Sequence, residues 1–181
     1  MGDASGEAAL THWGKYRARA IGEGLAAGRL GEGAAPNRRA DGRAGAGVPG
    51  HAKPAVVPVP QVVFTDPQVG TVGMTEAEAR SAGHRVATAQ VPWSAAAGAA
   101  LLRDDVEGGA KLVVDEETGL LLGATFVGPG AGELVHAATV AIVGAVNVAV
   151  LRHAVPSYPT ASELWLRLIE ELPRHLRHPS E

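Results

Sequence analysis

The sequence predicts an α+β fold in which helices cover one face of an antiparallel sheet. Stretches with strand character are grouped in the middle of the chain, and helical stretches are grouped towards its end. Two alternating stretches are separated only by the turn Glu116-Glu-Thr-Gly119, which is typical of an antiparallel hairpin. Apolar residues make up 46% of the 181 residues, enough for one sizeable core.

The first third of the chain differs in amino-acid composition from the rest. Residues 10–27 have helical character, with basic and acidic side chains among alanines and apolar residues. Residues 28–60 are dominated by Gly, Ala, Pro and Arg and contain few large apolar groups. Such a stretch cannot bury enough surface to offset its ordering entropy, so we interpret it as a linker. Three of its arginines, Arg38, Arg39 and Arg43, fit a solvated linker better than a binding patch.

The next stretch, residues 61–172, carries the predicted sheet and helices. Alternation and turn signals predict strands at residues 61–65, 69–72, 85–91, 110–115 and 120–127. Thr75 and Glu78 form a capping-box pattern that predicts a short helix ending before Gly83. Further helices are predicted at residues 128–143, at residues 148–153 and from Thr160 onward.

Two details of this region bear on the site. Thr160 and Glu163 repeat the capping-box pattern, so we expect them to cap the last helix. Leu164, Leu168 and Leu172 share one face of that helix at i, i+4 and i+8. Residues 93–105 are ambiguous and alanine-rich, and we expect them on the surface, whereas residues 173–181 form a polar tail.

Composition excludes several kinds of chemistry. The chain contains no cysteine, so it has no disulfide framework, thiolate nucleophile or zinc–thiolate site. A net charge of −3 gives no reason to expect nucleic acid or an anionic membrane as a partner. No apolar run reaches the roughly 18 residues of a membrane span, and the N-terminus lacks the pattern of a signal peptide. These features favour a cytoplasmic location.

For three candidate functional motifs, an ordinary structural explanation fits the sequence better than a functional one. Gly128-Pro-Gly-Ala-Gly-Glu133 follows a strand, but Glu133 stands where a dinucleotide fingerprint needs its third glycine, so we interpret a glycine-rich turn. The seven histidines are scattered, and His175 and His178 lie in the polar tail, so we predict no metal site. No Gly-x-Ser-x-Gly sequence supports a serine hydrolase.

Three motifs in order carry a family resemblance. The segment from Val63-Phe-Thr-Asp-Pro-Gln to Ala79, the segment from Gly123-Ala-Thr-Phe to Ala138, and Tyr158-Pro-Thr-Ala-Ser-Glu163 occupy roughly residues 60–172. Together they resemble the C-terminal dimerisation domain of the FAD-dependent pyridine nucleotide–disulfide oxidoreductases, such as dihydrolipoamide dehydrogenase, glutathione reductase and mercuric reductase. The resemblance implies an α+β dimerisation domain at residues 61–172 and a homodimer.

The N-terminus is similar to another part of the same family. Gly2-Asp3 and the stretch through Lys15 resemble the last flavin-binding segment, which makes residues 1–27 a remnant of an FAD-binding domain. By this resemblance Asp3 holds a ribityl hydroxyl of FAD, and Leu10 and Thr11 lie near the flavin at the start of a helix, where the helix dipole favours negative charge. The alternative is that Asp3 is a terminal residue without this role and Thr11 an ordinary N-cap.

The resemblance also marks a departure in the active site. The family's His-Pro-Thr-x-Ser-Glu motif supplies a proton-shuttling histidine to the partner subunit's site, held by the glutamate that matches Glu163. Here Tyr158 occupies the histidine position. A histidine has an ordinary pKa of about 6.5 and a tyrosine one of about 10, so tyrosine is a poor base at neutral pH.

These observations lead to one expectation and three alternatives. We expect the dimerisation domain of a flavin-dependent NAD(P)H oxidoreductase whose FAD and NAD(P) portions are missing here. With no cysteine pair, it would be inactive alone and bind FAD weakly or not at all. One alternative is a parent enzyme that reduces a quinone-type acceptor instead of a disulfide. Another is a free-standing, non-catalytic interaction module. An unrelated small α+β enzyme would need an ordered polar cluster that the sequence does not reveal.

Overall fold

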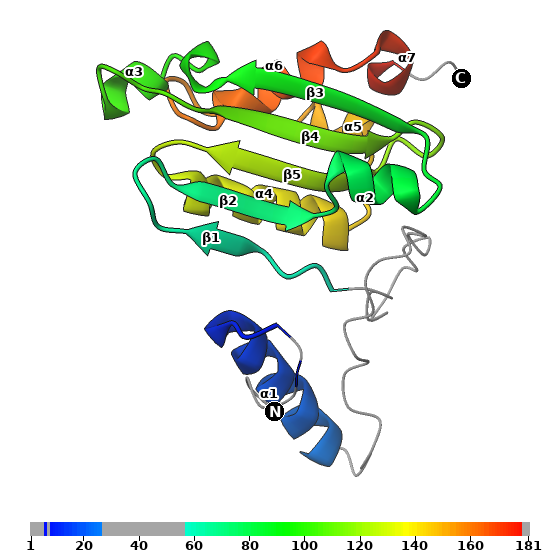
Figure 1. Ribbon diagram of the computed structural model, residues 1–181. Helices are drawn as coiled ribbons and strands as arrows, with labels where there is room; N and C mark the ends of the chain where they lie inside the picture. The colour runs from blue at the N-terminus through cyan, green and yellow to red at the C-terminus, as the bar shows by residue number, and fades with distance from the viewer. Residues whose placement is uncertain (1–5, 7, 27–56, 179–181) are drawn as a thin grey trace. The chain divides into compact units, whose positions relative to one another are not determined.

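The computed structural model describes residues 6, 8–26 and 57–178 (Figure 1). It divides into two units, Met1–Asp41 and Gly42–Glu181, which are considered separately. The first unit contains helix α1, Thr11–Ala26, in agreement with the predicted helix. Trp13 is the buried residue of α1, and its ring stacks on Tyr16 with 5.3 Å between the ring centroids. Most of the predicted linker, residues 28–56, lies outside the described residues.

The second unit is built on a five-stranded sheet whose neighbouring strands are all antiparallel (Figure 1). The strand order is β1-β2-β5-β4-β3. The strands are β1 Gln61–Val63, β2 Val69–Gly73, β3 Val86–Pro92, β4 Gly109–Asp115 and β5 Leu121–Val127. All five predicted strands are confirmed, although β1 ends two residues early.

The β4–β5 hairpin turns as the sequence predicts. Gly119 adopts a φ of +67°, a left-handed conformation that glycine reaches without steric cost, and its N–H donates to the carbonyl of Asp115 at 2.8 Å. The register slips by one residue between Val113 and Val114, as at a β-bulge.

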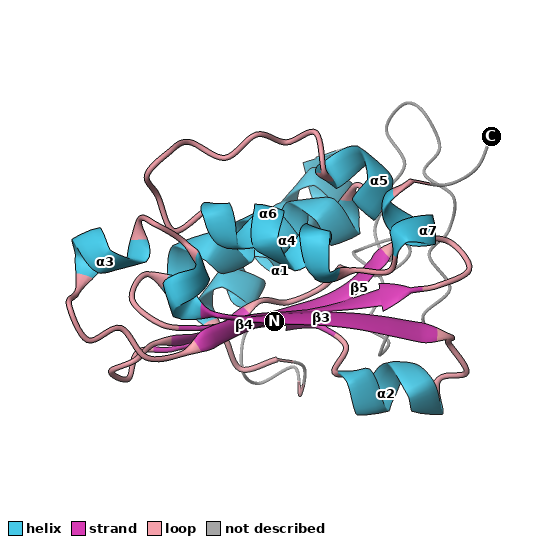
Figure 2. Ribbon diagram, turned by 90° about the horizontal axis from the view of Figure 1, so that it is seen from above, coloured by secondary structure: helices cyan, strands magenta, loops and turns pink. Residues whose placement is uncertain are grey.

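Helices cover one face of the sheet, as predicted (Figure 2). The main ones are α4, Ala131–Val143, and α6, Glu163–Glu171, accompanied by the short helices α5, Val148–Leu151, and α7, Arg174–Arg177. The short helix α2, Glu76–Ser81, lies on the opposite face (Figure 2). Its capping box is confirmed, since Thr75 Oγ1 accepts from Glu78 N–H and Glu78 Oε2 accepts from Thr75 N–H. No helix in the described ranges is long and apolar enough to cross a membrane.

The core lies between the sheet and the helices α4 and α6. The strands contribute Leu112, Val114 and Phe126, which are fully buried. From α6 come Leu164 and Leu168, also fully buried, as the predicted apolar stripe requires. A smaller cluster on the other face, beneath α2, contains Ala79, Val86, Val113 and Leu122.

The segment after β3 differs from its expected surface position. It forms the 3-10 helix η2, Trp93–Ala95, and the short helix α3, Ala99–Leu102. The Trp93 side chain is fully buried in the core, and a Cβ atom at Gly128 would lie 2.3 Å from its ring, so only glycine leaves room for it there. Leu101 and Leu102 in α3 are exposed. The predicted polar tail begins with α7, whose Leu176 is buried against the core.

Candidate functional site

The loop between α5 and α6 presents Tyr158 at the surface. The side chain of Tyr158 is 78% exposed, and the peptide bond to Pro159 is cis. The loop is fastened beside it, because the hydroxyl of Thr160 donates a hydrogen bond to the carbonyl of Ser157 at 2.6 Å. An exposed phenol on a folded loop is available to a molecule or subunit that docks there.

The predicted capping box of Thr160 and Glu163 is wrong. Ser162 precedes α6 and makes no capping hydrogen bond with its side chain. The Thr160 hydroxyl is engaged upstream with Ser157, and Glu163 is the first residue of the helix, with its side chain turned inward. Only 7% of Glu163 is exposed, and its Oε2 accepts a hydrogen bond from the backbone N–H of Gly98 at 3.3 Å.

Close backbone contact reinforces this link. A Cβ atom at Gly98 would lie 2.3 Å from Cα of Thr160, far inside van der Waals contact. Only glycine therefore lets the segment before α3 approach the loop that carries Tyr158. Gly98 was not singled out in the sequence, and one glycine in an alanine-rich stretch gives no signal of such an approach.

The two residues assigned to proton transfer by resemblance are not brought together. Tyr158 points to solvent, Glu163 is buried, and no hydrogen bond joins them in the described part of the chain. Glu163 thus has a backbone partner of its own, and it does not orient the phenol of Tyr158.

The residues assigned to FAD all lie in the first unit. Asp3 falls outside the described residues. Leu10 is half-buried, and Thr11 is the first residue of α1 with an exposed side chain. A helix N-terminus offers unpaired N–H groups and a positive dipole end. The position of Thr11 is therefore chemically suited to an electron-rich edge of a ligand.

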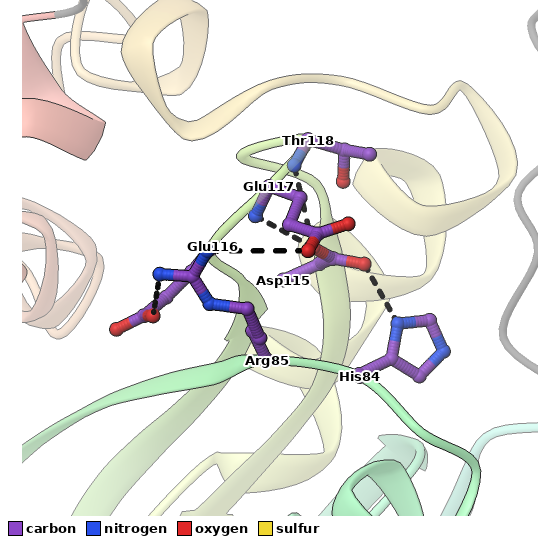
Figure 3. Close-up of polar contacts among 6 residues, drawn as sticks. All are labelled: His84, Arg85, Asp115, Glu116, Glu117 and Thr118. Atoms are coloured by element: carbon purple, nitrogen blue, oxygen red, sulfur yellow. Dashed lines mark hydrogen bonds and ion pairs between the residues drawn. The ribbon is translucent and has the colours of Figure 1, made fainter.

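An ordered polar cluster is present that the sequence did not reveal (Figure 3). The carboxylate of Asp115, at the end of β4, lies 2.7 Å from Nδ1 of His84 just before β3. Asp115 Oδ1 also accepts hydrogen bonds from the backbone N–H groups of Glu117 and Thr118. Burial alone would raise the pKa of Asp115, but the hydrogen bond with His84 and these two N–H donors outweigh it and lower that pKa.

The side chains of His84 and Asp115 are only 10% and 11% exposed, so the pair fastens the fold and presents little surface to a substrate. Nε2 of His84 is buried and without a hydrogen-bond partner. No serine or cysteine is joined to the pair by a hydrogen bond in the described ranges, and a nucleophile is what a His–Asp dyad would need to activate. The same hairpin turn is tied to α5, because the Asn147 amide donates to the carbonyl of Thr118 at 2.7 Å. Residues 6, 8–26 and 57–178 contain no group of three or more side chains suited to hold a metal ion.

Comparison with known proteins identifies the fold and motifs. Residues 59–169 match the family described as the pyridine nucleotide-disulphide oxidoreductase dimerisation domain. The dihydrolipoyl dehydrogenase of Thermus scotoductus is 43% identical over 120 residues, which cover 66% of this chain and 26% of that protein. Dihydrolipoyl dehydrogenase 2 of Haloarcula marismortui is 35% identical over 163 residues, which cover 90% of this chain and 30% of that protein.

A solved structure agrees with these relatives. The HOCl-induced flavoprotein disulfide reductase RclA from Escherichia coli superposes with a TM-score of 0.74 at 26% identity, covering 94% of this chain and 34% of that chain. The chain therefore belongs to the pyridine nucleotide–disulfide oxidoreductase family and contains its dimerisation domain. The predicted family and fold class are confirmed. The chain spans about a third or less of the length of these relatives.

Proposed function

We propose that this chain forms the homodimer interface of a flavin-dependent NAD(P)H oxidoreductase and presents Tyr158 to the flavin of the partner subunit. The observation that carries the proposal is the 78% exposure of Tyr158 on an otherwise fastened loop, at the family's histidine position. A side chain that served only the packing of its own domain would be buried.

Exposed apolar side chains support the dimer. They follow consecutive elements of the helical layer: Val140 and Val143 in α4, Val150 in α5, and Val155 in the loop that leads to Tyr158. Val155 is 88% exposed. Removing such groups from water contributes about 25 cal/mol per Å² of apolar area. A second copy of the chain is the occupant that a dimerisation domain implies, through a surface that is the same on both copies.

The cofactors follow from the relatives and from the first unit. RclA is described as a flavoprotein disulfide reductase, and other relatives are dihydrolipoyl dehydrogenases. In the complete oxidoreductase, FAD would supply electron transfer from NAD(P)H. Asp3, Leu10 and Thr11 would contact the flavin. Thr11, in the first turn of α1, would donate a hydrogen bond to the flavin or accept one from it. The chain has no cysteine, so it cannot supply a redox-active disulfide itself.

The tyrosine also favours a second candidate function, reduction of a quinone-type acceptor. The phenol of Tyr158 is not linked to the carboxylate of Glu163, so the proton relay of a disulfide reductase is not assembled. An exposed phenol can still donate a hydrogen bond to a quinone oxygen or form an aromatic wall for a flat acceptor.

The interface is tested by light scattering during size-exclusion chromatography, with absorbance recorded at the flavin band. We expect a dimer of twice 18.4 kDa. The substitution Val150→Glu places a charge in the proposed interface and should give monomers. Phe64→Glu is the matched control, since Phe64 is 82% exposed and follows β1 outside the helical layer. A wild-type monomer, or dissociation by the control alone, contradicts the proposed interface.

The colour of the same sample tests the cofactor assignment. A yellow species whose colour is lost on Thr11→Ala supports flavin contact at α1. A colourless dimer supports a dimerisation module that is non-catalytic by itself. In the assembled oxidoreductase, Tyr158→Phe should slow reduction of a water-soluble benzoquinone by NAD(P)H. An unchanged quinone rate with the phenylalanine variant contradicts a hydrogen-bonding role for Tyr158.

A further inference from the structure

A cluster of basic side chains forms where α7 packs beside the end of α5. Its members come from residues 152–153 and 174–178, and neither stretch contains an acidic residue. They are Arg152, His153, Arg174, His175, Arg177 and His178. The chain as a whole carries a net charge of −3, so this concentration of positive charge is local.

Packing of the two helices holds like groups together. Nη1 of Arg152 donates a hydrogen bond to the carbonyl of Arg177 at 2.9 Å. The same nitrogen lies 2.6 Å from Nδ1 of His178, which accepts from the guanidinium and is therefore neutral in this contact. These contacts hold Arg152 beside Arg177 and His178, and the packing of α7 beside α5 keeps the other basic residues nearby.

Carboxylates pair with the other described arginines of the second unit but not with these. Within residues 57–178, Arg80, Arg85, Arg103 and Arg167 each pair with an aspartate or glutamate. Arg152, Arg174 and Arg177 have no such partner among the same residues. In addition, Nε of Arg177 is buried without a hydrogen-bond partner. The cluster therefore holds an unsatisfied donor and positive charge that lacks a counter-ion.

The pKa of His178 reflects the same excess of positive charge. Desolvation lowers the pKa of His178 first, and repulsion from Arg152, Arg177, Arg174 and His153 lowers it further. Among the described residues, no acidic group raises that pKa. The same positive charges that disfavour the protonated form of His178 would attract an anion bound here.

We propose that the cluster of Arg152, Arg174, Arg177 and His178 is a binding site for a phosphoryl anion. Guanidinium groups present planar forks of N–H donors that match the oxygens of phosphate, and they retain their charge at any physiological pH. Several neighbouring positive groups suit a diphosphate better than a singly charged carboxylate, because the attraction grows with the charge of the ligand. None of these four residues is Tyr158 or one of the residues assigned to FAD.

The test uses the intact chain and pyrophosphate as the probe. Histidine ring proton signals are followed by NMR during titration at constant ionic strength. We expect saturable shifts at His178 and His153 and no shift at His84, whose ring lies in the Asp115 cluster. Arg174→Gln should weaken binding roughly tenfold through loss of a charge-assisted contact. Arg174 is exposed, so the variant should fold, and circular dichroism verifies this.

Arg167→Gln is the matched control, because it removes the same charge from an exposed, carboxylate-paired arginine of α6. It should bind pyrophosphate like the wild type. ADP is titrated in parallel. If ADP competes with pyrophosphate, as judged by the His178 signal, the diphosphate bound at this site can be part of a nucleotide. Shifts that rise linearly without saturation, or equal weakening by Arg167→Gln, would overturn the proposal. Light scattering on the same samples tests the dimer independently, so failure of one proposal leaves the other measurable.

Discussion

The buried carboxylate of Glu163 accepts a hydrogen bond from the backbone N–H of Gly98, 65 residues earlier in the chain, at 3.3 Å. This bond joins the start of α6 to the segment before α3. Gly98 also lies against the backbone of Thr160, so the loop that carries Tyr158 is supported from the α3 side as well as by its own hydrogen bond to Ser157.

We predict that Gly98→Ala destabilises the chain by about 2–3 kcal/mol, because a methyl group would meet backbone atoms that cannot yield. Urea-induced unfolding measures the effect. The control is Ala97→Ser, which adds one heavy atom at an exposed neighbouring position and should change the free energy of unfolding by less than about 0.5 kcal/mol. Equal stability of the two variants would contradict the close approach.

Glu163 provides a second prediction, which separates hydrogen bonding from charge. Glu163→Gln keeps an acceptor for the Gly98 N–H and should cost less than about 1 kcal/mol. Glu163→Leu leaves that buried donor unpaired and should cost about 2 kcal/mol or more. Unfolding curves of the two variants decide the point. A larger loss for the glutamine variant than for the leucine variant would show that the negative charge of Glu163 matters more than the hydrogen bond.

Local signals predicted most of the fold, and two identical patterns show their limit. The Thr75–Glu78 capping box formed as expected, since both partners lie within one turn of each other. The same pattern at Thr160 and Glu163 failed, because Ser157 engages the hydroxyl and Gly98 engages the carboxylate. Gly98 is distant in sequence, and no local pattern reports such a partner.

The polar cluster was missed for a similar reason. His84 and Asp115 are 31 residues apart, and the histidine reads as one of several scattered examples. A partial signal was present: an aspartate just before a turn often accepts backbone N–H bonds, as Asp115 does from Glu117 and Thr118. The histidine partner became visible only with the antiparallel pairing of Val86 with Asp115.

Asp115 should make the stability of the chain depend on pH in the acidic range. Its pKa is lower in the folded chain than the ordinary value of about 3.9. The stabilisation is therefore present above that ordinary value, and it is lost as the pH falls through the folded pKa. We predict that Asp115→Asn costs about 2 kcal/mol at pH 7 and that the difference from wild type shrinks below about pH 4.

Urea unfolding at a series of pH values measures this dependence. Glu117→Gln is the control, because its side chain is exposed and only its backbone N–H contacts Asp115. The control should follow the wild-type pH profile. A constant gap between wild type and Asp115→Asn from pH 7 to pH 3 would contradict the assigned role of the carboxylate.

The apolar stripe of α6 offers the last prediction. Leu168 is fully buried between the helix and the sheet, whereas Leu102 in α3 is 55% exposed. Leu168→Ala removes apolar contacts and leaves a cavity, so it should destabilise the chain by about 2–5 kcal/mol. Leu102→Ala removes the same atoms from a solvent-facing position and should cost less than about 1 kcal/mol. Urea unfolding compares them, and a similar loss for both would mean that α6 is not seated on the sheet, or that Leu102 is covered by a second copy of the chain. Repeating the measurement at two protein concentrations separates these cases, because only an intermolecular contact makes the loss at Leu102 depend on concentration.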